Sequence, residues 1–284
     1  MSNIQVISRP CPVCDESNPD AFRIFFDGYI KLFRCKRCGF VAQYPGPGKN
    51  TIIEKYDDCY SLNFLDKEQE FMYPHRARDF IDIAQRIKNY TCSSKSKLLD
   101  VGCGDGHFLS ICERLGFECY GVEPSKLLSK YASSKIKNPV IQSYYKKELF
   151  PSESFDVITF IQVLEHLSDP VGTLETAKYH LRAGGIIVIE VPSIWAPHFL
   201  LYRFTGIKWF VSPPTGVIYS HIGYYSPRSI RFLTNRVGFT QISLITGRWH
   251  VKYSGTLSKL AKFIDPLINI LKVGGILWIG KKEK

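Results

Sequence analysis

The chain has 284 residues, with 37 lysines and arginines against 26 aspartates and glutamates, so its formal net charge is +11. Hydrophobic residues make up 45% and charged residues 22%, which is typical of a globular protein and excludes disordered and fibrous classes. No stretch reaches the roughly 18 consecutive apolar residues of a membrane-spanning helix. The first residues lack the basic and apolar regions of a secretory signal, so we expect a cytoplasmic protein.

Nine cysteines are present, an odd number that favours a reducing compartment over disulfides. Four of them form two Cys-x2-Cys turns, at Cys11, Cys14, Cys35 and Cys38. Two such turns are typical of a tetrahedral four-sulfur zinc site, and residues 22–34 between them alternate like a hairpin around Asp27 and Gly28. Residues 1–44 are therefore predicted to be a zinc ribbon with structural zinc. The alternative interpretation is four unrelated free cysteines.

A short segment rich in proline and glycine follows the ribbon, at residues 44–48. Proline and glycine together are typical of turns and loops, so residues 45–74 are predicted to be a linker and pocket-side segment. Beyond it, residues 74–90 carry apolar side chains at helical spacing. Residues 75–284 are predicted to form the second and larger domain.

The most informative segment begins with an apolar strand at residues 97–101 and continues into a glycine-rich turn at residues 102–106. A helix is predicted from His107 to Leu115, and a second strand, residues 118–122, ends in Glu123. Glycines let a backbone approach a ligand closely, and a carboxylate after the second strand can accept hydrogen bonds from a ribose diol. Together they predict a nucleoside-containing cofactor on a Rossmann-like sheet.

Asp100 lies directly before this turn, which reads Gly-x-Gly-x-Gly and not the Gly-x-Gly-x-x-Gly of dinucleotide folds. A carboxylate repels a diphosphate but suits the ammonium group of an amino acid. The combination resembles the class I S-adenosylmethionine (SAM) methyltransferases. Residues 154–170 and 182–191 resemble further segments of that family, so the resemblance covers roughly residues 75–245. It implies an α/β fold with a Rossmann-like, seven-stranded mixed sheet.

The resemblance also implies a role for individual residues. Asp100 would lie near the methionine amino group, and Glu123 would hold the ribose hydroxyls. The turn residues that would line the methionine and ribose are Gly102, Cys103 and Gly104. Ser143 and Tyr144 stand where the adenine contact usually falls, although the usual acidic residue is absent. Ile161 and Gln162, at the end of the fourth strand, would lie beside the sulfonium.

Glu165 and His166 follow that strand and allow two interpretations. A few O-methyltransferases of this fold bind a divalent ion near such a pair. The favoured interpretation is that the pair buttresses the local helix and the cofactor pocket.

Residues 192–225 form an insertion rich in aromatic residues, which we expect to act as a lid on the acceptor pocket. Its end, within residues 217–227, resembles a segment of sugar methyltransferases that also carry an N-terminal four-cysteine zinc module. Tyr219 and His221 match residues that serve proton transfer in the C-methylating members, whereas Ser220 replaces a glutamate and argues against C-methylation. His221 is a candidate general base for an acceptor hydroxyl. Alternatively, His221 only holds the lid in place.

The remaining C-terminal part is predicted to contain a helix at residues 226–238 and strands at residues 239–245 and 276–280. An amphipathic segment at residues 257–272 interleaves aliphatic residues with lysines. Packing in the core is the favoured interpretation of this segment, and peripheral contact with an anionic membrane is the alternative.

The favoured function is SAM-dependent methylation of a sugar, nucleotide-linked or lipid-linked, in glycan or polysaccharide biosynthesis. The net charge of +11 also admits a nucleic-acid partner. The first alternative is therefore a ribosomal RNA base methyltransferase whose ribbon binds RNA, although the basic residues form no concentrated stripe. The second is a non-catalytic protein that keeps the SAM fold as a scaffold. The sequence does not decide the oligomeric state.

Overall fold

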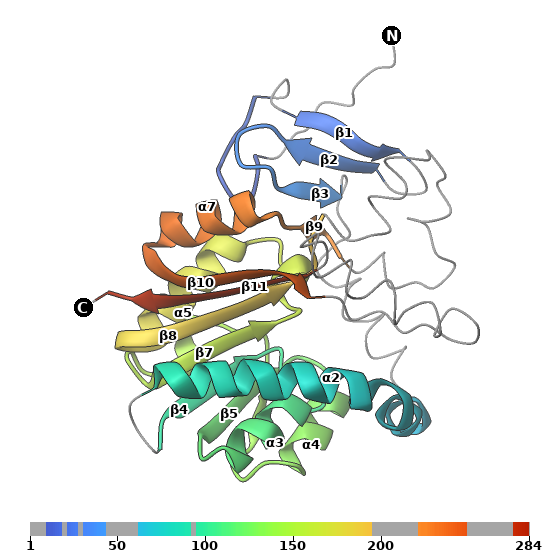
Figure 1. Cartoon of the computed structure of the whole chain (residues 1–284), viewed down its shortest axis with the longest axis vertical. Helices are drawn as coiled ribbons and strands as arrows, with labels where there is room; N and C mark the ends of the chain where they lie inside the picture. Colours follow the sequence, from blue (N-terminus) through green and yellow to red (C-terminus); the bar gives the residue numbers. More distant parts are fainter. Residues whose placement is uncertain are drawn as a thin grey trace.

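A computed structural model describes residues 10–18, 22–27, 31–43, 62–91, 95–194, 221–248 and 275–283. Its larger part is an α/β fold around a seven-stranded sheet (Figure 1). In spatial order the strands are β10 (Phe239–Arg248), β11 (Gly275–Lys282), β8 (Leu181–Val191), β7 (Phe155–Ile161), β4 (Lys97–Val101), β5 (Glu118–Glu123) and β6 (Val140–Gln142). All neighbouring pairs from β8 to β6 are parallel, and β11 runs antiparallel to both β8 and β10. The predicted Rossmann-like, seven-stranded mixed sheet is therefore confirmed.

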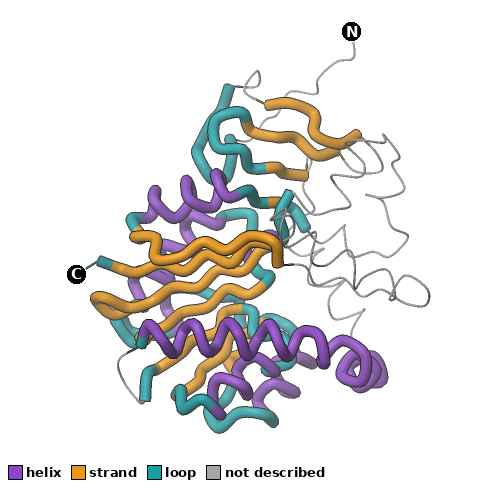
Figure 2. The backbone as a smooth tube through the Cα atoms, viewed as in Figure 1, coloured by secondary structure: helices purple, strands orange, loops and turns teal. Residues whose placement is uncertain are grey.

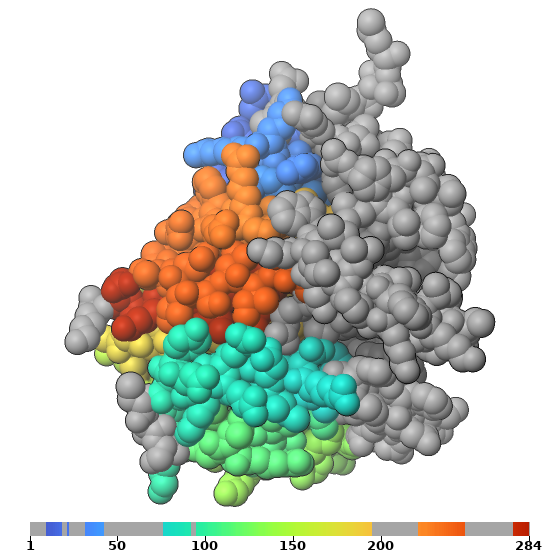
Figure 3. All heavy atoms as spheres, in the orientation of Figure 1, coloured from blue at the N-terminus to red at the C-terminus, as the bar shows by residue number. Residues whose placement is uncertain are grey.

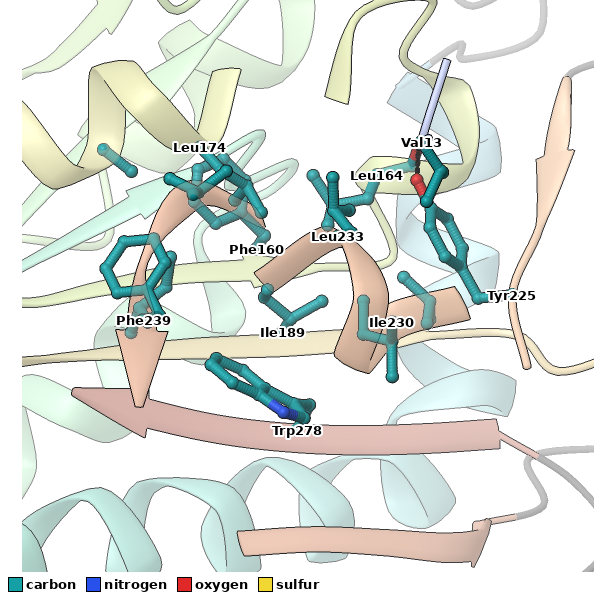
Figure 4. Packing of buried hydrophobic residues seen from close by; sticks show 14 of the residues in the cluster. Val13, Phe160, Leu164, Leu174, Ile189, Tyr225, Ile230, Leu233, Phe239 and Trp278 are labelled. Carbon is teal, nitrogen blue, oxygen red and sulfur yellow. Dashed lines mark hydrogen bonds between the residues drawn. The ribbon is translucent and has the colours of Figure 1, made fainter. Parts of the chain in front are cut away.

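Helices cover both faces of this sheet (Figure 2). On one face, apolar residues of α2 (Leu62–Tyr90), α3 (His107–Arg114) and α4 (Lys126–Ser133) pack into one hydrophobic cluster. On the other face, α5 (Pro170–His180) and α7 (Pro227–Val237) contribute to a second cluster around Phe160, Ile189 and Trp278 (Figure 4). Among the helices that the structure describes, none is long and apolar enough to cross a membrane.

Local signals mark the ends of α5 and of α7, the helix predicted at residues 226–238. Asp169 caps α5 by accepting a hydrogen bond from the Gly172 N–H, and Pro170 occupies the first turn. Ser226 caps α7, which ends at Gly238 in a left-handed conformation. These short-range signals predict α5 and α7 because the interactions that cap a helix are local.

The start of α2 differs from the prediction. The helix begins at Leu62, within the predicted linker, whereas apolar spacing and Pro74 placed its start at residue 74. Pro74 lies inside the helix, and Figure 1 shows that α2 changes direction in its N-terminal part. A proline is tolerated inside a bent helix, so it did not mark a boundary in this case.

The N-terminal residues form a separate four-stranded sheet in the order β1 (Phe22–Asp27), β2 (Lys31–Cys35), β3 (Val41–Gln43) and β9 (Gly223–Tyr224). The predicted hairpin is the antiparallel pair β1 and β2. The fourth strand, β9, comes from the larger part of the chain. In Figure 3 the N-terminal atoms, in blue, lie directly against the atoms around α7, in orange. The cysteine-containing segment is thus joined to the larger part through a shared sheet.

Several predicted features lie outside the described residues. They include residues 195–220 of the proposed lid, the amphipathic segment 257–272 and most of the predicted linker.

Candidate functional site

Asp100, the last residue but one of β4, and Glu123, the last residue of the parallel neighbour β5, are both buried, at 3% and 7% exposure. Asp100 accepts a hydrogen bond of 2.6 Å from the hydroxyl of Thr159 on β7. Burial raises the pKa of Asp100 to about 7, an effect that the Thr159 hydrogen bond opposes and the nearby charge of Glu123 increases. Two buried carboxylates at the same edge of a sheet suit a ligand that carries positive charge and hydroxyl groups.

Glu123 also organises the glycine-rich turn. One of its carboxylate oxygens accepts the Gly104 N–H at 2.9 Å, and the other accepts the Ser125 N–H at 2.9 Å. This side chain therefore ties the end of β5 to the turn after β4. The turn and the acidic residue, predicted from separate signals, belong to one hydrogen-bonded unit.

The glycines at this turn are required for two different reasons. Gly102 has a φ of 68°, and a Cβ there would lie 2.7 Å from the Val163 side chain. Gly104 also has positive φ, but a Cβ there would meet nothing within 4 Å. The backbone at Gly104 therefore borders open space beside Asp100 and Glu123, in keeping with the close approach of a cofactor.

The other predicted cofactor residues lie at the same edge of the sheet, where the parallel strands end. Cys103 is buried in the turn, Ser143 follows β6, and Ile161 is the last residue of β7. Tyr144 is 56% exposed. Gln162 adopts a φ of 57°, which is unusual for a residue with a side chain, and its N–H donates to the Glu190 carbonyl. Strained backbone of this kind often occurs at functional sites.

Beyond β7 the chain forms the short helix η3 (Leu164–His166), which contains the fully buried Glu165. His221 Nε2 lies 4.0 Å from a Glu165 carboxylate oxygen, and the rings of His166 and His221 are 4.8 Å apart. Neither oxygen of Glu165 has a hydrogen-bond partner among the described residues. Burial raises the pKa of Glu165 to about 8. One carboxylate and two imidazoles therefore meet next to the predicted methyl-donor position.

A second buried carboxylate, Glu190 on β8, lies close enough to contribute to the raised pKa of Glu165. It forms an ion pair of 3.6 Å with Arg76 of α2. The sequence analysis missed both residues. The available signal was an acidic residue inside the otherwise apolar run of residues 186–191.

The predicted zinc ligands come together as expected for a tetrahedral site. Cys11 and Cys38 have sulfur atoms 3.6 Å apart, as have Cys14 and Cys35, and all four are buried within 4.8 Å of one another. Tetrahedral zinc with bonds of about 2.3 Å separates its sulfur ligands by about 3.8 Å. The Phe40 N–H also points to Cys38 Sγ at 3.5 Å. These four residues could hold one tetrahedral ion.

The two predicted catalytic residues are not equally visible. His221 is described and lies beside Glu165, whereas Tyr219 and its neighbour Ser220 lie outside the described residues.

Comparison with known sequences gives a family match over residues 72–244, more than half of the chain, to a model described as a methyltransferase domain. The chain is 32% identical over 112 residues to a ubiquinone biosynthesis O-methyltransferase of Bradyrhizobium sp. (strain ORS 278), covering 37% of this chain and 44% of that protein. A protein with the same name from Psychrobacter arcticus is 24% identical over 157 residues, covering 52% of this chain and 61% of that protein. These matches span only part of each relative.

Solved structures agree in fold. A SAM-dependent methyltransferase from Archaeoglobus fulgidus superposes with a TM-score of 0.53 at 20% identity, covering 78% of this chain and all of that one. A geranyl diphosphate methyltransferase in complex with SAM gives a TM-score of 0.52 at 14% identity, covering 71% of this chain and 85% of that one. With the buried acidic pair, the glycine-rich turn and the strand order already described, these matches show that the chain belongs to the class I SAM-dependent methyltransferases.

Proposed function

We propose that the protein transfers a methyl group from SAM to a hydroxyl group of a sugar, nucleotide-linked or lipid-linked, in glycan biosynthesis. The observation that carries this proposal is the position of His221 beside the buried Glu165, directly after β7. The likeness of the segment around His221 to sugar methyltransferases supports a sugar acceptor, and the charge of +11 suits its phosphate groups.

The proposed chemistry needs a base and an aligned acceptor. When bound, SAM supplies a methyl group on a positively charged sulfur. His221 would take up the hydroxyl proton as the acceptor oxygen gains the methyl group, and the carbon–sulfur electron pair would stay on sulfur. Glu165, which has a carboxyl oxygen 4.0 Å from His221 Nε2, would stabilise the resulting imidazolium in its ionised form, which dominates above its raised pKa of about 8.

The test of the acceptor class uses SAM with a labelled methyl group. The purified full-length protein is incubated with extract fractions containing nucleotide sugars, lipid-linked glycans, isoprenoid quinone precursors or total RNA. Label in either glycan fraction supports the proposal. Label only in quinone precursors would show that this chain acts in the pathway for which its relatives are named. Label only in RNA would establish the RNA alternative. Either result overturns the sugar assignment.

The same proposal assigns the SAM contacts. Asp100 would bind the ammonium group, Glu123 the ribose hydroxyls, and Gly102, Cys103 and Gly104 would line the methionine and ribose. Ser143 and Tyr144 would border the adenine. Ile161 and Gln162 would lie beside the sulfonium.

SAM affinity should depend on pH through Asp100. In the free protein this carboxyl has a raised pKa of about 7, and the SAM ammonium binds its ionised form. Below that pKa binding must release a proton, so affinity should fall by up to about tenfold for each pH unit and level off above it. Calorimetry in buffers of different ionisation heat measures both the affinity and the proton released. An affinity that stays constant from about pH 5.5 to pH 8 would contradict the assignment of Asp100.

The proposal also includes structural zinc in the four-cysteine cluster. A variant with Cys14→Ser and Cys38→Ser should lose the metal, because each change removes a thiolate from the tetrahedral site. Metal analysis of the purified protein measures this, with one zinc per chain expected in the wild type. Cys112→Ala, which changes a buried cysteine of α3 outside the cluster, is the control and should keep its zinc. A double variant with full zinc content would contradict the zinc site.

Glu165, His166 and His221 could also hold a divalent ion, since their ligand atoms lie within 4.8 Å of one another. Such an ion would activate the acceptor in place of His221 acting as a general base. The same metal analysis separates the two mechanisms. If the wild type holds a second ion that Glu165→Gln loses, the mechanism is metal-assisted and not general-base catalysis. If the wild type holds a single zinc and Glu165→Gln retains it, the result supports His221 as the general base.

A further inference from the structure

The five residues from His221 to Tyr225, which we call the acceptor strap, are held from two sides. On one side, β9 pairs antiparallel with β3 of the ribbon, Val41 opposite Tyr224 and Ala42 opposite Gly223. On the other side, the Ile222 N–H donates to the Glu165 carbonyl at 2.9 Å. The strap thus connects the ribbon to the helix that carries Glu165.

Phe40 forms the closest link between the ribbon and the strap. Its ring occupies the space where a Cβ of Gly223 would lie, so the two backbones can approach only because residue 223 is glycine. The same ring packs on Tyr225, with centroids 4.9 Å apart. Tyr225 in turn donates a hydrogen bond to the Leu164 carbonyl, and Figure 4 shows it beside Val13 and Leu164. The aromatic side chain of Phe40, two residues after Cys38, therefore contacts the strap at two residues.

Both cysteine turns are also bound to α7, directly after the strap. Arg236 donates to the Val13 carbonyl, inside the first Cys-x2-Cys turn, and forms an ion pair with Asp15. Arg228 donates to the Arg37 carbonyl, inside the second turn. Both cysteine turns are therefore bound to the helix that directly follows the strap in the chain.

Without the ribbon the strap would keep hydrogen bonds to the larger part of the chain, among them those from the Ile222 N–H to the Glu165 carbonyl and from the Ile194 N–H to the Tyr225 carbonyl, but it would lose the pairing of β9 with β3. β9 is two residues long, and the ladder it forms among the described residues is with β3. A strand this short is not stable alone, and a small cysteine-rich module without its metal loses the main source of its folding energy. By contrast, Asp100 on β4 hydrogen-bonds to Thr159. Glu123 on β5 accepts hydrogen bonds from the Gly104 and Ser125 N–H groups, all within the larger part of the chain.

We propose that the ribbon is part of the acceptor site, and that Phe40 is a positioning residue which sets the place of His221 opposite Glu165. Metal in the cysteine cluster would order the acceptor strap and permit methyl transfer without changing SAM affinity. This inference rests on the proposed function in that it takes the acceptor to bind at His221.

The test compares Phe40→Ala with Phe33→Ala in the full-length protein. Phe33 lies on β2, which does not adjoin β9 in the sheet, so its loss removes a ring of equal size from the ribbon but not from the strap. Phe40→Ala is expected to keep its zinc and its SAM affinity. It should show faster hydrogen exchange in the peptide containing Ile222 to Tyr225, and kcat should fall roughly 100-fold, the cost of misplacing a reacting group by about 1 Å. Phe33→Ala should retain strap protection.

Gly223→Ala supplies a matched second measurement. When Phe40 is present, the methyl group of the new alanine would collide with the Phe40 ring. Gly223→Ala alone should therefore loosen the strap as Phe40→Ala does. In the Phe40→Ala background the ring is absent, so the same change should have little further effect. This non-additivity is the signature of direct coupling between the two residues.

Three results would overturn the inference. Phe40→Ala could leave the hydrogen-exchange rate of the strap unchanged, the effects of Phe40→Ala and Gly223→Ala on kcat could simply multiply in the double variant, or Phe40→Ala could lower SAM affinity as much as it lowers kcat. Hydrogen exchange needs no acceptor, so these results are separate from the fate of the sugar assignment. If the two substitutions have non-additive effects on hydrogen exchange but the protein methylates another class of acceptor, the role of the ribbon is supported and only the sugar assignment is contradicted.

Discussion

Replacing Asp100 by asparagine is expected to weaken SAM binding by at least about 100-fold, because removing one partner of a buried charge pair costs roughly 3–5 kcal/mol. The variant should still fold, since an asparagine oxygen can accept the 2.6 Å hydrogen bond from Thr159. Calorimetric titration with SAM measures the affinity. The pH dependence described above should also disappear, because the titrating group is gone.

The same substitution should stabilise the free protein above neutral pH. The pKa of Asp100 is raised from 3.8 to about 7, so ionisation costs stability progressively as pH rises between these values and the full cost is present above pH 7. Each pKa unit corresponds to about 1.4 kcal/mol, so Asp100→Asn should unfold at a higher temperature at about pH 8. Glu175→Gln, which neutralises an exposed carboxylate of α5, is the control and should change neither property. Wild-type SAM affinity in Asp100→Asn would refute the placement of the cofactor.

Replacing His221 by alanine is expected to lower kcat about 10²- to 10⁴-fold, the usual contribution of a general base, with SAM affinity unchanged. The imidazole lies 4.0 Å from the buried Glu165 and is partly exposed, so added imidazole should enter the space and restore part of the rate. Rescue of this kind does not follow from a purely structural role. Turnover is measured with the acceptor fraction that takes up label.

His166→Ala is the matched control for this experiment, because its ring lies 4.8 Å from that of His221 on the same side of Glu165. The general-base mechanism predicts a smaller loss for His166→Ala and no rescue by imidazole. Equal losses in both variants, together with loss of a bound ion, would assign the two histidines to a metal. Wild-type kcat in His221→Ala would remove His221 from the chemistry.

Local sequence was sufficient for the cofactor side of the molecule. The segment from Asp100 to Gly106 and the acidic end of the next strand predict one site because parallel neighbours place their carboxyl ends at the same edge. Their juxtaposition follows from the fold class alone. The hydrogen bond from Gly104 to Glu123 shows the two signals meeting in one unit.

The acceptor side was only partly predictable. His221 was a candidate from its neighbouring residues, but its contact with Glu165 joins two residues that are far apart in the chain. Phe40, Arg76 and Glu190 belong to no sequence motif that would indicate a role. Their roles arise from packing across elements, which period and composition do not encode.

The sequence by itself determined the fold class, the position of the glycine-rich turn and the pairing of the four cysteines into two turns, because each depends on residues close together in the chain. Only the tertiary structure decided that the ribbon shares a sheet with the acceptor strap and that α7 binds both cysteine turns. The contact between Arg228 and Arg37 spans 191 positions. A hydrogen bond to a backbone carbonyl selects no particular partner side chain, so such a contact leaves no pattern in the sequence and exists only once the chain has folded.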